Sequence, residues 1–159
     1  MVNSVLINPN DLTSILLRLS AAVLIGGLVG WTRQRSGKAA GLRTHMLVTM
    51  TAAILVLIPA QIKSAQPEAS ISYVLQGISN GVGFLGAGVI LRSSDVESRQ
   101  LKIKGLTSAS EIWVSAALGA CSGCGLWLIS LMGTVLMLLV LVVAKRLERL
   151  IVVGGGDDL

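Results

Sequence analysis

Five separate apolar stretches, divided by charged segments, restrict the fold of this chain more than any other feature. Each has about 18 to 20 residues, which as a helix is long enough to cross a hydrocarbon core of roughly 30 Å. Apolar residues make up 53% of the 159-residue chain, so such stretches dominate it. They predict five membrane-spanning helices, over Leu12–Trp31, Met46–Ile62, Ile71–Leu91, Thr107–Gly123 and Leu126–Ala144.

The predicted fold is all-α, a polytopic transmembrane helical bundle. The stretches are continuously apolar and about twice as long as a barrel strand needs to be, which argues against spanning strands. Residues 1–150 form one membrane domain, and residues 151–159 form a short flexible tail. A glycine-rich turn around Gly123 and Gly125 separates the last two stretches, so we expect a tight helical hairpin there.

The positions of lysine and arginine predict the orientation, because cytoplasmic loops retain them during insertion. Cations fill the first and third connections and follow the last stretch, whereas the second connection has only Lys63 and the fourth has no charge. This alternation places the N-terminus outside and the C-terminus in the cytoplasm. The cations concerned are Arg33, Arg35, Lys38, Arg43, Arg92, Arg99, Lys102, Lys104, Lys145, Arg146 and Arg149.

The formal net charge of +5 is explained by this topology and indicates no nucleic-acid partner, since the chain has no aromatic platform for bases. We interpret the cations as a solvated, lipid-facing rim in preference to a specific anion site. The single histidine comes without a nucleophile, base and orienting group, so we expect no enzymatic activity and no cofactor.

Cys121 and Cys124 form a Cys-Ser-Gly-Cys pair in the predicted outer hairpin. An oxidising compartment would permit a disulfide or a redox pair, but small residues in a crowded turn explain the pattern as well. We favour the structural interpretation, and two cysteines without further ligands predict no metal site.

The third stretch has the densest pattern of small residues. Spacings of four allow close helix packing, so we expect this segment to be the central helix. An unwound turn that exposes carbonyl groups to an ion is the alternative, because glycine lowers helix stability. The glycines are Gly77, Gly81, Gly83, Gly86 and Gly88.

Three polar residues inside the predicted spans are the best indicators of function, since an ionised group at a helix centre costs about 3 kcal/mol. Arg18 lies about 9 Å from the outer end of its span, which leaves snorkelling to the interface and a buried ion pair as alternatives. Asn80 falls near mid-membrane, where it must hydrogen-bond across helices or face water. Glu111 lies one turn inside the fourth span, and Arg33 or Arg43 is its expected partner.

The basic loop before the second span contains Arg43, Thr44 and His45. Thr44 is expected to cap the second helix, and Arg43 to pair with Glu111. For His45 we favour a hydrogen bond to a neighbouring helix over a pH- or metal-sensing role. Because the loop before Thr107 opens the fourth span in a similar way, the two loops are expected to form one polar cytoplasmic site.

Four segments resemble the membrane domain of the MgtC/SapB family of bacterial inner-membrane proteins. They are RLSAAVLIGGLVG, AGLRTHMLV, GVGFLGAGVILR and KGLTSASEIWVSAALG, with KRLERL near the end. The resemblance implies a multi-pass inner-membrane protein, dimeric, and linked to magnesium homeostasis and low-magnesium adaptation. It also implies partners among other membrane proteins, in addition to the surrounding lipids.

The chain departs from the family pattern at charged positions. Thr32 and Gln34 stand where an acidic pair is usual, and Ser70–Tyr73 replaces an Asp-Pro-x-Arg segment. Glu111 stands where a small residue is usual, so an acid-dependent role would be lost or moved to Glu111. We also expect the regulatory C-terminal domain found in many members to be absent.

Two functions are compatible with these features. The favoured one is a non-enzymatic regulator whose small-residue faces bind a second copy and another inner-membrane protein. The alternative is an oligomeric transporter for magnesium, another cation or a small solute, whose path runs past Asn80 and Glu111.

Overall fold

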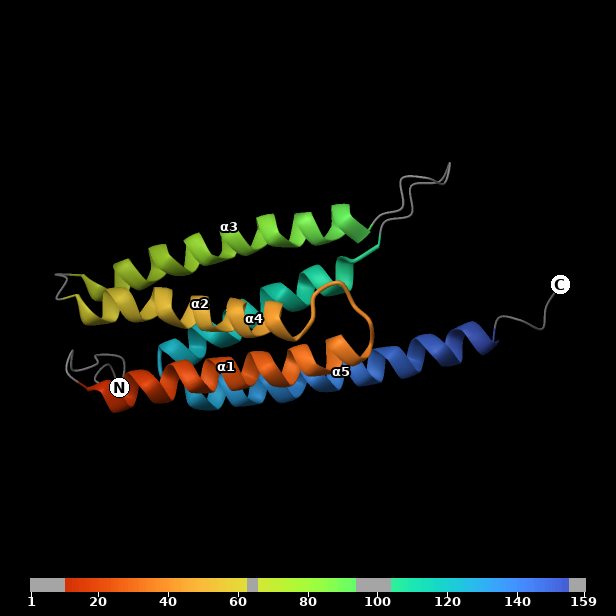
Figure 1. Ribbon diagram of the computed structural model, residues 1–159, viewed down its shortest axis with the longest axis horizontal. Coiled ribbons are helices and arrows are strands. Elements are labelled where there is room, and N and C mark those ends of the chain that lie inside the picture. The colour runs from red at the N-terminus through yellow and green to blue at the C-terminus, as the bar shows by residue number, and fades with distance from the viewer. Residues whose placement is uncertain (1–10, 63–65, 94–103, 155–159) are drawn as a thin grey trace.

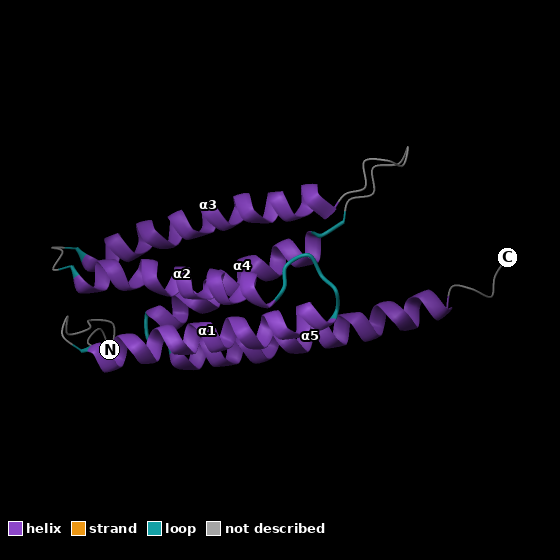
Figure 2. Ribbon diagram, in the orientation of Figure 1, coloured by secondary structure: helices purple, strands orange, loops and turns teal. Residues whose placement is uncertain are grey.

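The computed structural model describes residues 11–62, 66–93 and 104–154, and all regular structure in these ranges is helical (Figures 1 and 2). The all-α prediction is confirmed. The five helices are α1 (Leu12–Arg35), α2 (Leu42–Gln61), α3 (Pro67–Ser93), α4 (Leu106–Gly123) and α5 (Trp127–Gly154).

Four of the described helices, α1, α2, α3 and α5, are long and apolar enough to cross a membrane. The helix α4 coincides with the predicted fourth span to within one residue. Its 18 residues include Glu111 and four serines, and it is not one of these four helices. The outward orientation of the N-terminus stays a prediction.

The helices form three layers (Figure 1). The helix α3 lies on one side, α2 and α4 lie in the middle, and α1 and α5 lie on the other side. Because α4 contacts all four of the other helices, it is the centre of the bundle. The expectation that the third span is central is therefore wrong, since α3 contacts only α2 and α4 among the described helices.

Two glycines of α1 allow close contact with α2. A Cβ atom at Gly26 would lie 2.4 Å from Oγ1 of Thr49, and one at Gly30 would lie 2.6 Å from Cα of Leu42. No side chain fits at these distances. The two glycines are four residues apart, the spacing that brings membrane helices into backbone contact.

The same face of α2 also packs on α4 through glycines. A Cβ atom at Gly119 would lie 2.2 Å from the carbonyl oxygen of Thr49, and one at Gly123 would lie 2.7 Å from that of Ala53. These glycines are also four residues apart. One face of α2 thus meets glycines of both α1 and α4, and the main hydrophobic core lies along α2, α3 and α4.

The predicted tight hairpin joins α4 to α5. Gly125 has a φ of +76°, a left-handed conformation that glycine adopts without strain. The amide of Leu126 donates to the carbonyl of Cys121 at 2.9 Å, which closes the turn. Both Cys121 and Cys124 are free thiols in this structure.

Several helices extend past the predicted spans. The helix α1 continues to Arg35, and α5 remains helical to Gly154. The division into a membrane domain and a tail at residue 150 stays a prediction. Lys63, Arg99, Lys102 and residues 155–159 lie outside the described residues, as do the side chains of Arg92 and Arg149.

Candidate functional site: a buried charged cluster

A buried ion pair joins α1 to α4. Nε of Arg33 contacts Oε2 of Glu111, and both side chains are more than nine-tenths buried. Arg33 reaches this position because α1 continues beyond Trp31 and turns Arg33 toward the same side as Arg18 and Gly26. Of the two partners predicted for Glu111, Arg33 is therefore the one found, and Arg43 is exposed on α2.

His45 extends this cluster toward the middle of the bundle. Its side chain is completely buried, and Nδ1 lies 2.9 Å from Oγ of Ser115 on α4. This contact agrees with the favoured interpretation, a histidine that hydrogen-bonds a neighbouring helix. The cluster thus combines one cation, one carboxylate, an imidazole and a hydroxyl from α1, α2 and α4.

The cluster is rich in buried polar atoms that lack hydrogen bonds. Nη2 of Arg33, Oε1 of Glu111 and Nε2 of His45 are buried, and none has a hydrogen-bond partner among the described residues. Unsatisfied buried groups of this kind cost about 1–3 kcal/mol each, and more when they are charged. The site therefore has unused capacity to donate and accept hydrogen bonds.

Arg18 lies at the opposite end of the bundle, about 22 Å along α1 from Arg33. Nη1 of Arg18 donates to the carbonyl of Gly123 at 2.8 Å, and Oγ of Ser122 donates to the carbonyl of Arg18 at 3.0 Å. Arg18 is buried, and its guanidinium reaches the turn between α4 and α5. It satisfies a free carbonyl at the end of α4, and snorkelling to the interface stays a prediction.

Thr44 does not cap α2. The N-cap residue is Gly41, and the amide of Leu42 donates to Oε1 of Gln34 at 3.3 Å. The chain enters α2 two residues earlier than Thr44, which places Thr44 inside the first turn. Thr107 is exposed at the start of α4 and belongs to the same end of the bundle as Glu111.

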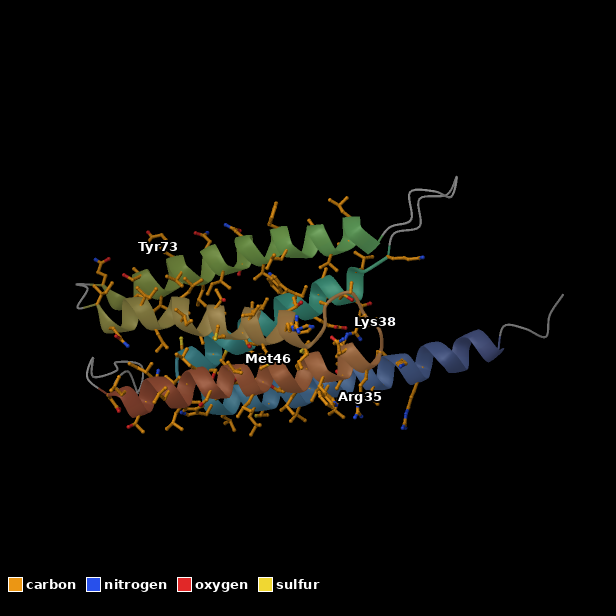
Figure 3. The ribbon with its side chains drawn as sticks, viewed as in Figure 1. Arg35, Lys38, Met46 and Tyr73 are labelled. Atoms are coloured by element: carbon orange, nitrogen blue, oxygen red, sulfur yellow. The ribbon has the colours of Figure 1, made fainter. Side chains whose placement is uncertain are left out.

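Asn80 lies apart from this cluster. It is exposed near the middle of α3, on the side that faces away from the other helices. Tyr73, two turns earlier on that side, points outward in Figure 3. The structure therefore does not bring Asn80 together with Glu111.

The glycines of α3 make little contact within the chain. A Cβ atom at Gly77, Gly81, Gly83 or Gly88 would meet no atom within 4 Å, and one at Gly86 would lie 3.4 Å from Cβ of Ala109. Their predicted role in packing does not hold inside this protomer. A role in contacts with another chain stays a prediction.

Sequence reasoning named Arg33 only as one of two expected partners of Glu111, and it did not place Ser115 in the site. The residues of α1 that are buried include Arg18, Ala22, Gly26, Gly30 and Arg33, which recur at helical spacing. Extending this periodicity beyond the apolar stretch would have favoured Arg33 over Arg43. Nothing in the local sequence distinguishes Ser115 from the other serines of α4.

Comparison with known proteins identifies relatives of the chain. The sequence profile of the MgtC family matches residues 19–150. Protein SrpB of Synechococcus elongatus is 42% identical over 154 residues, which cover 94% of this chain and 85% of SrpB. The putative magnesium transporter YhiD of Escherichia coli is 38% identical over 137 residues, 83% of this chain and 61% of YhiD.

Protein MgtC of Salmonella typhimurium is 34% identical over 146 residues, 89% of this chain and 59% of MgtC. The aligned region of this chain thus spans about three fifths of YhiD and of MgtC. No solved structure matches the chain. Because the family profile extends from α1 to α5, the chain belongs to the MgtC family and is a multi-pass protein of the bacterial inner membrane.

Proposed function

We propose that this protein is a non-enzymatic regulator in magnesium homeostasis or low-magnesium adaptation that acts through helix–helix contacts in the membrane. The similarity to YhiD of Escherichia coli, a putative magnesium transporter, supports the link to magnesium. A second copy of the chain is the first partner we propose, and another inner-membrane protein is the second.

The outward face of α3 is the observation that supports this mechanism. Asn80 lies about 20 Å from either end of α3, so the bilayer offers its amide no water. An amide at this depth is stabilised by a hydrogen bond to another helix. Gly81 and Gly83 lie beside it with open space around them, which allows the backbone of a partner helix to approach closely.

The alternative is a transporter whose path passes Asn80 and Glu111. Within one protomer these side chains face different directions, Asn80 away from the bundle and Glu111 toward Arg33 on α1. A shared path would therefore need a second protomer. This separation favours the regulator over the transporter.

Co-purification of two differently tagged copies tests the proposal. We expect Gly83→Leu to abolish the association, because the larger side chain keeps the partner helix away. Ser20→Leu is a matched control, since Ser20 is exposed on α1 and its hydroxyl donates to carbonyls of Leu16 and Leu17 in its own helix. Helical content and thermal stability should be unchanged in both variants.

Unchanged association of Gly83→Leu would refute the role of this face. The same samples in liposomes also test the alternative, because magnesium flux that is lost in Glu111→Gln would support transport. Flux unaffected by Glu111→Gln would remove Glu111 from any path.

A further inference from the structure

A cluster of cations surrounds a cavity at the end of the bundle that is predicted to be cytoplasmic. The cavity has a volume of about 380 Å³ and lies between the end of α1, the start of α4 and the later part of α5. Arg33, Lys38 and Lys145 line it. An adjoining hollow of about 260 Å³ shares Arg33 and Lys145 and adds Arg146.

These side chains leave an excess of positive charge. Four cations line the two hollows, and among the described residues the one ion pair that joins them to a carboxylate is that of Arg33 with Glu111. Like charges that converge on one cavity repel each other, and low-dielectric walls strengthen the field inside it. The cavity therefore favours an anion.

Arg33 also has a free donor at this place. It is only 8% exposed, and its Nη2 has no hydrogen-bond partner among the described residues. Nε is already occupied by Glu111, and Arg33 lines the cavity, so its guanidinium adds positive charge to the wall. This charge attracts the phosphate group of a ligand in the cavity.

The cavity continues into an apolar groove between α4 and α5. This groove has a volume of about 350 Å³ and shares Thr107, Val140 and Leu141 with the cationic cavity. It extends along α5 to Gly133, about 12 Å toward the middle of the membrane. A free phosphate would fill only the cationic part, whereas a phospholipid has both a phosphate and an acyl chain.

We infer that the cationic cavity binds the headgroup of an anionic phospholipid, with one acyl chain of that lipid in the groove between α4 and α5. Basic pockets between transmembrane helices on the cytoplasmic side bind such headgroups. Figure 3 shows Lys38 in the connection after α1, near Arg35. The site lies on α1, α4 and α5, whereas the proposed partner face is on α3, in the layer on the other side (Figure 1).

Native mass spectrometry of the purified chain in a nonionic detergent tests this inference. Phosphatidylglycerol and phosphatidylcholine are added at equal concentrations, and we expect phosphatidylglycerol to be retained preferentially. The double variant Lys38→Gln, Lys145→Gln should retain at least about tenfold less of it. Arg43→Gln, which removes an exposed cation of α2, should have no such effect.

Leu136→Trp distinguishes a lipid from a free anion. Leu136 is 57% exposed and lines only the apolar groove, so the larger ring should displace the acyl chain without altering the cations. Loss of phosphatidylglycerol in this variant supports the lipid site. Two results together would overturn it in favour of a free-anion site. They are full displacement of phosphatidylglycerol by millimolar inorganic phosphate and normal retention of phosphatidylglycerol in Leu136→Trp.

Two further results would overturn the inference. One is equal retention of the two lipids by the unaltered chain, and the other is an equal loss in Arg43→Gln, which would indicate nonspecific surface charge. If the double variant does not fold, the comparison of lipids on the unaltered chain and the Leu136→Trp variant still decide the question.

Discussion

Removing one member of the Arg33–Glu111 pair should destabilise the protein far more than removing both. Arg33 is 8% exposed and Glu111 is 4% exposed, so water would solvate a lone survivor poorly. Loss of one partner from such a pair costs about 3–5 kcal/mol, whereas apolar replacement of both is often neutral or stabilising. We expect about 3–5 kcal/mol for Arg33→Met and for Glu111→Leu, and less than either for the double variant.

Unfolding by SDS in a zwitterionic detergent without added lipid measures these free energies. The three tryptophans of the chain provide the fluorescence signal. Independent effects would add to about 6–10 kcal/mol in the double variant, so the difference from the measured value is the coupling energy. Arg43→Met, an exposed cation on α2, is the control and should stay within about 0.5 kcal/mol of the original chain.

A double variant that costs the sum of the two single variants would refute this reasoning. It would show that Arg33 and Glu111 do not depend on each other in the folded protein. A negligible cost for Glu111→Leu alone would refute it as well, because Arg33 would then have adequate solvation without the carboxylate.

Three more substitutions test the glycine packing and the hydrogen bond of Arg18. Gly119→Ala should lower the free energy of unfolding by about 1–3 kcal/mol, because its Cβ would lie 2.2 Å from a backbone oxygen of α2. Gly77→Ala, which has open space around it, should be neutral or slightly stabilising. Equal effects of the two variants in SDS unfolding would contradict this. Arg18→Met should cost about 1.5–3 kcal/mol by removing a charged hydrogen bond to the carbonyl of Gly123, and a change below 0.5 kcal/mol in the same assay would rule that contribution out.

Hydropathy predicted the helices well but not their full length. The predicted fourth span begins at Thr107 and α4 begins at Leu106, yet α1 runs four residues past Trp31 to Arg35. Hydropathy detects the part of a helix that lies in hydrocarbon, whereas backbone hydrogen bonds continue into the polar interface. Arg33 lies in that polar extension, which explains why hydropathy alone did not favour it over Arg43 as the partner of Glu111.

Glycine spacing did not predict which helix is central. Gly77 and Gly81 on α3 have the same four-residue spacing as Gly119 and Gly123 on α4, but only the second pair meets the backbone of α2. The spacing shows that one face of a helix has only small residues, but it does not show which helix packs on that face. The neighbour depends on how each helix is rotated about its axis, and that rotation is set by the packing of the whole bundle.

The charged cluster lies beside charged positions at which this chain departs from what the resemblance implies. Thr32 and Gln34 stand where the resemblance implies an acidic pair, and they flank Arg33 in α1. In the structure the carboxylate beside Arg33 comes from Glu111 on α4, while Gln34 accepts from the first amide of α2. Since a buried arginine needs an anion nearby, Glu111 is the residue through which we expect an acid-dependent role of this cluster to act.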